Sequence, residues 1–459
     1  MGALNAVRFL VQRMPPDQRR LLVLSQLALV VSVVLELLIP QQIQRIIDEG
    51  IRNGDIGAIV VTSSVMLGFS VASAGFAVIA VWLGSKIATE TAHRIRVLLY
   101  EKVTSLSFGD IDRFRTGPLL VRLTSDVAIV RGGLLMAIVM LIRAPVMLIG
   151  AIALVALDTP QLLLPTLLVV TAMGALILTI VPRLGPLYST QQSMLDRLNT
   201  VLQENLSGVQ VVKNFVRQPL EIDRYTERND DLYAAAVRPA RRVAVMDPSF
   251  MTLLYLAVAG ALVLAGREGA ASLTAGELAT FFNYLLTAML PIAFLGFLMP
   301  ELGRLATSLG RFREVFETVP DVVEAESPVE LGRLEGRVEF ENVTMHYLDA
   351  DGNPSGRPVL ADVSFTVEPG ETVVILGSTG SGKSSLLHLI PRFYDATSGV
   401  VRVGGVDVRR LDKNSLRRNI GVALQSPQLF SGSVMENLRY GRPAATDEEI
   451  VAAAKAAQA

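Results

Sequence analysis

Six long apolar stretches between residues 21 and 300 constrain the fold of this chain more than any other feature. Each holds about 20 residues or more, which as an α-helix crosses the ~30 Å hydrocarbon core of a bilayer. A single stretch of this length is compatible with a buried helix of a soluble core, but six in series without a strand pattern predict a bundle of membrane helices. The predicted spans are residues 21–40, 56–84, 134–157, 161–182, 243–266 and 278–300.

The composition is intermediate between that of a membrane protein and that of a soluble protein, as expected for a chain with one part of each kind. Hydrophobic residues make up 51% of the 459 residues and charged residues only 19%, against about 25% in an average soluble protein. The formal net charge of −1 gives no case for nucleic-acid binding. The sequence has no cysteine, which excludes disulfides, thiolate catalysis and cysteine-ligated zinc, and its three histidines are too scattered for a metal cluster.

Lysine and arginine are distributed unevenly among the segments that connect the predicted spans. Four precede the first span, eight lie in the loop at about 84–131 and nine in the loop at about 183–242, whereas each alternate loop carries at most two. By the positive-inside rule, both termini and these two loops are predicted to be cytoplasmic, in a multi-pass protein of the plasma or inner membrane. The two loops have a helical pattern, so the spans are expected to continue as helices beyond the bilayer.

The residues after the last span have a different character. Residues 318–336 are acidic and contain prolines and a glycine, which is typical of a linker. Alternating apolar and polar residues at 337–341, 361–367 and 399–404 then predict strands of an α/β domain. The predicted organisation is a six-helix transmembrane domain at 1–317, a linker at 318–336 and an α/β domain at 337–459.

The segment Gly377-Ser-Thr-Gly-Ser-Gly-Lys-Ser384 fits the phosphate-binding P-loop pattern G-x-x-x-x-G-K-[ST]. Residues 371–376 before it are predicted to form a short buried strand, and residues 384–390 after it a helix that ends at Pro391. This strand–loop–helix context argues against a chance match in a glycine-rich loop. The second domain is therefore expected to be a P-loop NTPase domain.

Each residue type in the P-loop has a chemical role. Glycines let backbone N–H groups turn toward phosphate without a Cβ clash. Lys383 supplies a positive charge to the β- and γ-phosphates, and the Ser384 hydroxyl is placed to ligate Mg²⁺. A nucleotide site behind a helical membrane domain suggests that nucleotide energy moves a substance across the bilayer. The predicted nucleotide-binding residues of the loop are Gly377, Ser378, Thr379, Gly380, Ser381, Gly382, Lys383, Ser384 and Ser385.

Over essentially its whole length the chain resembles an ABC exporter half-transporter, in which six membrane helices precede an ATP-binding cassette. In the cassette, Tyr347 matches the A-loop aromatic residue that stacks on adenine. Gln425, within Val422-Ala-Leu-Gln-Ser-Pro427, matches the Q-loop glutamine that contacts Mg²⁺ and the attacking water. Residues 429–437 match the stretch that touches the membrane domain.

Two parts of the predicted cytoplasmic loops resemble the coupling regions of this family. The first comprises residues 110–114, 116–117 and 122–127, and the second runs from 204 to 217. The sequence around residues 110–114, together with Arg143-Ala-Pro145, looks most like one half of the bacterial heterodimeric multidrug exporters.

The resemblance implies an ATP-hydrolysing translocase that exports an amphipathic compound such as a drug or a lipid, with ATP and Mg²⁺ as cofactors. Ser384 and Gln425 would hold the metal, and Gln425 would also be catalytic. The implied partners are the bilayer, the small-molecule substrate and a second half-transporter, with a heterodimer favoured over a homodimer. Two alternatives stay open: a membrane regulator that binds nucleotide without turnover, and a homodimeric lipid flippase.

The family's signature sequence, its Walker B strand with the catalytic glutamate and its switch histidine follow the Q-loop at positions that this sequence does not include. We therefore expect a partial sequence whose cassette holds the A-loop, the Walker A P-loop and the Q-loop. On this expectation, the chain alone is inactive as an ATPase.

The ionisable residues Glu36 and Arg143 lie within predicted spans and are candidates for a functional site. Counted from the outer ends of the predicted spans, their depths differ by ~15 Å, so no direct pairing is expected. Either side chain is a candidate to line a wet cavity and bind substrate. The alternatives are snorkelling of Glu36 to the interface and an intersubunit hydrogen bond of Arg143.

Overall fold

The computed structural model describes residues 15–267, 273–330, 332–333, 336–349, 353–426 and 428–458, without the side chains of residues 247, 264–265, 267 and 290–300. By their contacts, the residues form two compact units. The helical unit contains Met1–Thr104 and Thr116–Thr318, and the sheet unit contains Ser105–Arg115 and Val319–Ala459.

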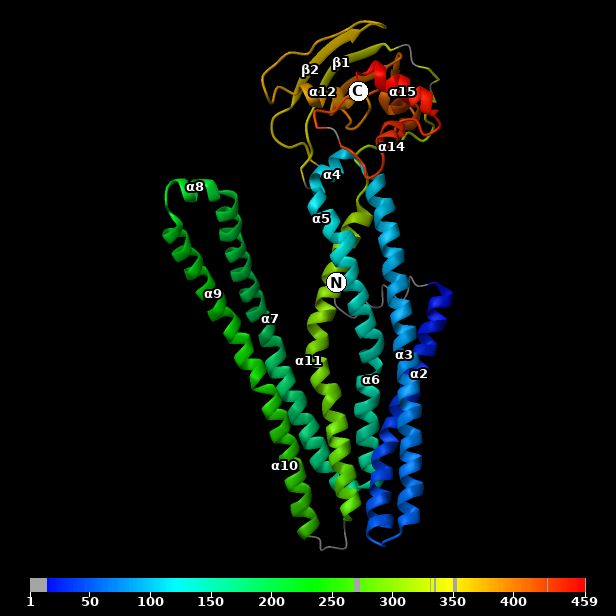
Figure 1. Ribbon diagram of the computed structural model, residues 1–459, viewed down its shortest axis with the longest axis vertical. Helices are drawn as coiled ribbons and strands as arrows, with labels where there is room; N and C mark the ends of the chain where they lie inside the picture. Colours follow the sequence, from blue (N-terminus) through cyan, green and yellow to red (C-terminus); the bar gives the residue numbers. More distant parts are fainter. Residues whose placement is uncertain are drawn as a thin grey trace. The chain divides into compact units, whose positions relative to one another are not determined.

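Long helices make up the helical unit (Figure 1). The longest are α3 with 50 residues and α7 with 45 residues, which at about 1.5 Å per residue exceed the ~30 Å of a bilayer core. The expected continuation of the helices beyond the membrane is therefore confirmed. The elements are α2 (Pro16–Arg45), the π-helical turn η1 (Ile46–Ile51), α3 (Ile56–Ser105), α5 (Thr116–Val121), η2 (Arg122–Asp126), α6 (Val127–Asp158), η3 (Pro160–Leu162), α7 (Leu163–Ser207), α8 (Val209–Asn214), α9 (Gln218–Ala244), α10 (Met246–Arg267) and α11 (Ala275–Glu317).

Five of the six predicted spans lie in helices that are long and apolar enough to cross a membrane. These helices cover Pro16–Ile51, Ile56–Ser105, Thr116–Asp158, Pro160–Ser207 and Gln218–Val263. The sixth predicted span, 278–300, falls in α11, where the side chains of 290–300 lie outside the description. The chain is thus a mostly helical, multi-pass membrane protein in its larger part.

Prolines do not end α2, α6 or α7, although the sequence analysis closed spans at prolines such as Pro40 and Pro182. Pro40 lies inside α2, Pro145 inside α6, and Pro182 and Pro186 inside α7. The fixed ring removes one backbone donor, but packing against neighbouring helices makes proline tolerable inside a membrane helix. At Pro40 the backbone is supported from outside, because the Thr280 hydroxyl of α11 donates to the Pro40 carbonyl oxygen at 2.9 Å.

An ion pair joins α2 to α6, although the sequence analysis expected no direct pairing of these two charges. Arg143 Nη2 donates to Glu36 Oε2 at 2.7 Å, so the two residues that were expected to be too far apart in depth form an ion pair. The error came from ending α2 at Pro40. The helix continues through η1 to Ile51, and each charge then lies fifteen residues before the C-terminal end of its helix, Ile51 or Asp158.

The buried core of the helical unit draws on several helices. Leu37 of α2, Met173 of α7, Leu254 of α10 and Phe281 of α11 belong to one cluster of buried apolar side chains. Beyond this core, α7 and α9 run side by side and α8 joins their ends, which gives a helical hairpin (Figure 1). The core therefore binds the spans together, while the hairpin extends from them.

The sheet unit is built on a four-stranded antiparallel sheet in the order β2-β1-β3-β4. Its strands are β1 (Val338–Met345), β2 (Leu360–Val367), β3 (Ser398–Val403) and β4 (Val406–Asp407), which confirms the three predicted strand segments. Leu386 and Leu389 of α12 (Lys383–Leu389) pack with Phe340, Val343 and Val401 of the sheet in one apolar core. The other helical elements are α4 (Phe108–Phe114), η4 (Val408–Arg410), α13 (Lys413–Arg418), α14 (Val434–Arg439) and α15 (Asp447–Ala456).

The strand predicted at 371–376 is not formed, while the helix predicted after the P-loop is confirmed as α12. Val374 is 73% exposed and Leu376 88% exposed, so the segment is not buried either. A strand is stabilised by hydrogen bonds to a neighbouring strand and by a covered face. In the part of the chain that the structure describes, no strand pairs with residues 371–376.

Candidate nucleotide-binding site

The P-loop folds around the side chain of its own lysine. Lys383 Nζ donates to the Gly377 carbonyl oxygen at 2.9 Å, to the Ser378 carbonyl oxygen at 2.7 Å and to Ser381 Oγ at 3.4 Å. The ammonium group is thus held inside the loop by neutral acceptors and lacks an anionic partner among the described contacts. A phosphate oxygen is a stronger partner for an ammonium than a carbonyl oxygen, because both groups are charged.

Glycine is required at specific positions of this loop. Gly380 has φ +85° and Gly382 has φ +89°, which are left-handed conformations that a side chain disfavours. A Cβ on Gly377 would lie 2.5 Å from Ser381 Oγ, and one on Gly382 would lie 2.7 Å from the Val359 carbonyl oxygen. The backbone therefore approaches itself and its neighbours as closely as a phosphate cradle needs.

The residues present fit a nucleotide phosphate with its magnesium ion. The loop supplies an ammonium, backbone N–H groups and the start of α12, whose partial positive charge favours an anion. Ser384 is exposed on the first turn of α12, and its hydroxyl would hold Mg²⁺ together with phosphate oxygens and water. Among the described residues, no group of three His, Cys, Asp or Glu side chains offers an alternative metal site.

Tyr347 lies two residues after the end of β1 and reaches the helix that follows the P-loop. Its hydroxyl is hydrogen-bonded to Ser385 Oγ at 2.9 Å, and Ser385 is itself buried at 6% exposure. The Tyr347 ring is 38% exposed, so part of its surface is free for contact. The structure thus brings together two predicted nucleotide-binding residues that are 38 positions apart in the chain.

Gln425 is not brought into this arrangement. It lies in an exposed segment without strand or helix, between Val422 at 50% exposure and the end of the described stretch at 426. None of the described contacts joins Gln425 to the P-loop, and Pro427 of the predicted Q-loop lies outside the described residues. Its predicted roles toward metal and water stay predictions.

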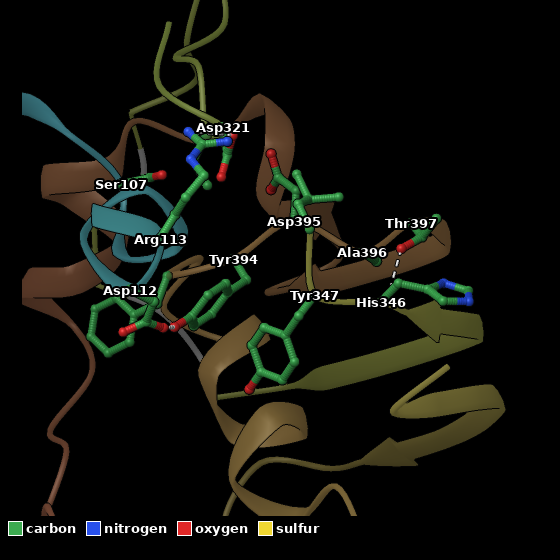
Figure 2. Close-up of a pocket in the computed structure, with 14 residues that line it drawn as sticks. Ser107, Asp112, Arg113, Asp321, His346, Tyr347, Tyr394, Asp395, Ala396 and Thr397 are labelled. Carbon is green, nitrogen blue, oxygen red and sulfur yellow. Dashed lines mark hydrogen bonds and ion pairs between the residues drawn. The ribbon is translucent and has the colours of Figure 1, made fainter. Parts of the chain in front are cut away.

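A cavity of about 520 Å³ opens beside Tyr347 within the sheet unit (Figure 2). Four segments line it: α4 with its preceding residue, the start of the 319–336 segment, the residues that follow β1 and the loop after α12. Figure 2 shows Tyr347 and Tyr394 next to one another, with Asp112 of α4 facing the Tyr394 hydroxyl. Its lining residues include Ser107, Asp112, Arg113, Asp321, Leu348 and Asp395.

Tyr394 connects the two sides of the cavity. Its ring meets the Tyr347 ring edge-on, with centroids 5.5 Å apart and planes at 85°. Its hydroxyl donates to Asp112 Oδ2 at 2.5 Å. Burial, followed by the hydrogen bond to the Asp112 carboxylate, raises the pKa of the Tyr394 phenol well above its ordinary value. The phenol therefore stays protonated and remains a donor.

The α4 helix is fixed to the sheet unit by a cluster of charges. Asp110 is fully buried, caps α4 with Ser107 and forms an ion pair with Arg113. The backbone N–H of Asp321 donates to Asp110 Oδ2 at 3.3 Å, and Arg113 lies 3.8 Å from Asp321 Oδ1. Burial and the neighbouring Asp110 charge raise the pKa of the Asp321 carboxyl, against the opposing effect of Arg113.

The sequence analysis did not select Tyr394, Asp321 or Asp395 as site residues. The run Arg392-Phe-Tyr-Asp395 was the available signal, because it places opposite charges and two aromatic rings directly after the predicted helix. Arg392 is 3% exposed and has φ +52°. It binds the Asp395 carboxylate and the Val323 carbonyl oxygen, which holds this loop in place.

The fold and the P-loop together define a membrane protein with a fused nucleotide-binding part. The family description "ABC transporter transmembrane region" matches residues 22–292, and the description "ABC transporter" matches residues 360–459. The chain belongs to the ABC transporters, as a half-transporter that carries a membrane part and an ATP-binding part on one chain. ATP binding and membrane transport are the general properties of this family.

Curated relatives are about one-third identical to this chain over the residues that align. An uncharacterized ABC transporter ATP-binding protein, YfiB of Bacillus subtilis (strain 168), is 31% identical over 440 residues, which cover 95% of this chain and 75% of the relative. The fatty acid ABC transporter ATP-binding/permease protein of Mycobacterium bovis is 32% identical over 413 residues, which cover 88% of this chain and 63% of the relative. This chain therefore spans roughly two thirds to three quarters of these relatives' lengths.

Among solved structures, a bacterial Atm1-family ABC exporter with ATP bound resembles this chain. The TM-score is 0.73 at 22% identity, and the likeness covers 96% of this chain and 77% of the other. At this identity the likeness establishes the fold alone. The resemblance to an ABC exporter half-transporter and the predicted fold class are thereby confirmed.

Proposed function

We propose that this chain is the subunit of an ATP-driven exporter that moves an amphipathic compound out of the cytoplasm or the inner leaflet. The observation that carries the proposal is the P-loop with Lys383 at its centre, on the same chain as helices long enough to cross a membrane. Nucleotide binding would drive transport through its different affinity for two conformations of the transporter.

In this proposal, different residues of the nucleotide site contact the phosphates, the metal and the base. Lys383 and the backbone of 377–382 bind the phosphates, and the Ser384 hydroxyl helps to hold Mg²⁺. Tyr347 offers an aromatic face to the base, and Gln425 would approach the metal and the attacking water once its segment is ordered against the P-loop. The cassette and both termini would lie in the cytoplasm, in agreement with the lysine and arginine bias of the loops.

The amphipathic class of the substrate is supported by the helical unit. Its described spans are apolar, yet they carry one partly exposed ion pair, Glu36 with Arg143, at side-chain exposures of 34% and 27%. The relative from Mycobacterium bovis is named a fatty acid transporter, and a fatty acid combines a charged group with an apolar tail. A second half-transporter is proposed as the partner, with a heterodimer favoured over a homodimer.

Nucleotide binding to the chain in lipid nanodiscs tests the first part of this function. Equilibrium dialysis with radiolabelled ATP and Mg²⁺ should show saturable binding, and Lys383→Ala should weaken it at least tenfold because the phosphate charge loses its partner. The matched control is Lys455→Ala in α15, which should bind ATP as the wild type does. Equal binding by Lys383→Ala and wild type would remove the P-loop assignment.

Transport is tested in inside-out membrane vesicles that contain this half-transporter, extended to the length of its curated relatives, together with its partner subunit. ATP-dependent accumulation of a fluorescent fatty acid, absent with Lys383→Ala, is the expected result. ATP binding without accumulation of any amphiphile would instead favour a membrane regulator that binds nucleotide without turnover.

A further inference from the structure

We propose that a groove between α7 and the junction of α9 with α10 holds an anionic phospholipid of the cytoplasmic leaflet. An acyl chain would lie in the groove, and the phosphate would lie against Arg183 and Arg241. The inference goes beyond the proposed function, because it concerns a resident lipid and needs neither nucleotide nor transport. It assigns a ligand to a part of the helical unit that is separate from the nucleotide site.

The groove lies where α7 and α10 are next to one another (Figure 1). Its volume is about 590 Å³, which is within the range of small-ligand sites. Ala172 and Leu176 line it from α7, and Ala244, Pro248 and Leu253 are among the residues that line it from α9 and α10. The groove is therefore large enough to receive part of a lipid.

The polar side chains in the groove are satisfied by their own helix. The Ser249 hydroxyl donates to the Val245 carbonyl oxygen at 2.7 Å, and the Thr252 hydroxyl donates to the Pro248 carbonyl oxygen at 2.8 Å. The other described lining residues are alanine, leucine, valine and proline. A lining of this kind favours a hydrocarbon chain, because a polar ligand would lose its hydrogen bonds to water without gaining new ones.

Two arginines continue the helix faces that line the groove. On α7, Leu176, Thr179 and Arg183 follow one another at intervals of three and four residues, so they share one face of the helix. Arg183 Nη1 donates to the Thr179 carbonyl oxygen, which turns the guanidinium back toward the groove. On α9, Arg241 lies one helical turn before Ala244.

Both arginines lie at the level expected of lipid headgroups. Arg183 is about 30 Å along α7 from Leu163, at about 1.5 Å per residue, which is the thickness of the hydrocarbon core. Arg241 is in the last turn of α9, just before the apolar helix α10 begins. The lysine and arginine bias of the loops predicts that this end of the helices is cytoplasmic.

The charge of the two arginines favours a phospholipid with an anionic headgroup. Both side chains are exposed, and neither has an anionic partner among the described side chains, which do not include that of Asp247. A guanidinium binds a phosphate through parallel hydrogen bonds between charged groups. The cytoplasmic leaflet is rich in anionic lipids, and basic pockets between membrane helices on this side bind their headgroups.

A second half-transporter is the other candidate to cover this groove. Around a two-fold axis, an identical or similar subunit would bring its own arginines opposite Arg183 and Arg241. The like charges would repel one another, whereas a phosphate would neutralise them. The positions of the two arginines therefore favour the phospholipid.

Photolabelling in nanodiscs tests the lipid and its headgroup. Phosphatidylglycerol and phosphatidylcholine, each with a diazirine in the acyl chain, are irradiated with the chain, and the labelled peptides are identified by mass spectrometry. We expect phosphatidylglycerol to label the peptides that contain 172–176 and 244–253 about fivefold more than phosphatidylcholine does, because only its headgroup carries a net negative charge for the arginines. Excess unlabelled phosphatidylglycerol should remove the label.

Substitution of both arginines tests the headgroup contact. Arg183→Gln combined with Arg241→Gln should lower labelling by phosphatidylglycerol to the level of phosphatidylcholine. The matched control is Arg197→Gln, which should label as the wild type does, because Arg197 is exposed on α7 but lies about 21 Å further along the helix than Arg183. Equal labelling by the two lipids in the wild type, or preferential labelling that survives the double substitution, would overturn the inference.

A larger side chain in the groove tests the position of the acyl chain. Ala244 lines the groove and is exposed, so Ala244→Phe should fill the groove and lower labelling by phosphatidylglycerol about fivefold or more, although both arginines remain. Ala234→Phe at another exposed position of α9 is the matched control and should label as the wild type does. Wild-type labelling of Ala244→Phe would show that the acyl chain lies elsewhere.

A cross-linker placed in the groove separates the lipid from a second subunit. The chain has no cysteine, so a benzophenone maleimide attached to Ala244→Cys reacts from this position alone. Irradiation in native membranes should leave the chain at its own mass on a denaturing gel, apart from the small increase from bound lipid. A cross-link to a second half-transporter would assign the groove to a subunit interface and overturn the inference.

Discussion

Arg143 of α6 donates a hydrogen bond of 2.7 Å to Glu36 of α2, in the middle of two membrane helices. The apolar residues Leu27, Val31 and Val34 are exposed at helical spacing along α2. Glu36 lies about 200° around the helix from Val34, so its carboxylate faces away from that apolar stripe. The pair therefore joins α2 to α6 on a face of α2 that points away from this exposed apolar stripe.

Removing one charge of this pair should cost more stability than removing both. Glu36→Gln leaves Arg143 without its anion, and Arg143→Gln leaves Glu36 without its cation, whereas the double variant leaves two neutral amides. We expect a coupling free energy of about 1–2 kcal/mol, the scale of a strong interhelical hydrogen bond in a membrane protein. Thermal unfolding of the four proteins in detergent measures it. The exposed pair Arg313–Glu317 is the control, for which the coupling should be near zero. Additive effects of the two α2–α6 variants would contradict the expectation.

Gly382→Ala should disable the P-loop. The added Cβ would be 2.7 Å from the Val359 carbonyl oxygen and would sit on a residue with φ +89°. We expect a loss of about 1–3 kcal/mol in stability and of most ATP affinity, because the loop has to open to relieve the contact. Gly421→Ala is the matched control, since a Cβ at Gly421 meets no atom within 4 Å and its φ is ordinary. ATP dialysis and thermal unfolding in parallel report the outcome, and wild-type behaviour of Gly382→Ala would show that the loop has another conformation.

Two substitutions at Tyr347 should separate its ring from its hydroxyl. Tyr347→Phe removes the bond to Ser385 and should cost about 0.5–1.5 kcal/mol of stability while ATP affinity stays near the wild-type value. Tyr347→Ala also removes the aromatic face and should weaken ATP binding by about 1–3 kcal/mol, by analogy with base–aromatic stacking elsewhere. Equal ATP affinity in the Phe and Ala variants would show that the ring does not contact the base.

The Asp321 carboxyl should make the sheet unit less stable as the pH rises. Its pKa is raised in the folded protein, so the folded state binds the proton more tightly than the unfolded chain does. The stabilisation is complete below the ordinary value of 3.8 and is lost as the pH rises through the raised pKa. Asp321→Asn should flatten this pH dependence and raise the melting temperature at pH 7. Asp395→Asn, which breaks the ion pair with Arg392, should lower it.

The absence of cysteine makes membrane topology directly testable. Cysteine at Gln161, beside the short turn between α6 and α7, should react with an impermeant thiol reagent in intact cells. Cysteine at Arg217, beyond the far end of α8, should react only after the cells are opened. Both positions are exposed, whereas Thr159 in the same turn is 2% exposed and would be shielded for structural reasons. The reverse pattern of labelling would invert the predicted orientation.

The sequence alone determined the features that depend on composition, length and local chemistry. Five of the six predicted spans became candidate membrane helices, because an apolar stretch of that length satisfies its backbone hydrogen bonds within itself. The sequence also predicted the P-loop glycines, Lys383 and α12, because a motif of fixed spacing and the local backbone conformation determine them.

Only the tertiary structure decided which distant residues meet. The Glu36–Arg143 pair depends on where α2 ends, and the helix continues past Pro40, where Thr280 of α11 donates a hydrogen bond to the Pro40 carbonyl oxygen. The contact of Tyr394 with Asp112 joins residues 282 positions apart, and the missing strand at 371–376 depends on partners that local β-propensity does not supply. Each of these features follows from the pairing of separate segments, whose free energy is set by packing across the fold and not by the residues next to them in the chain.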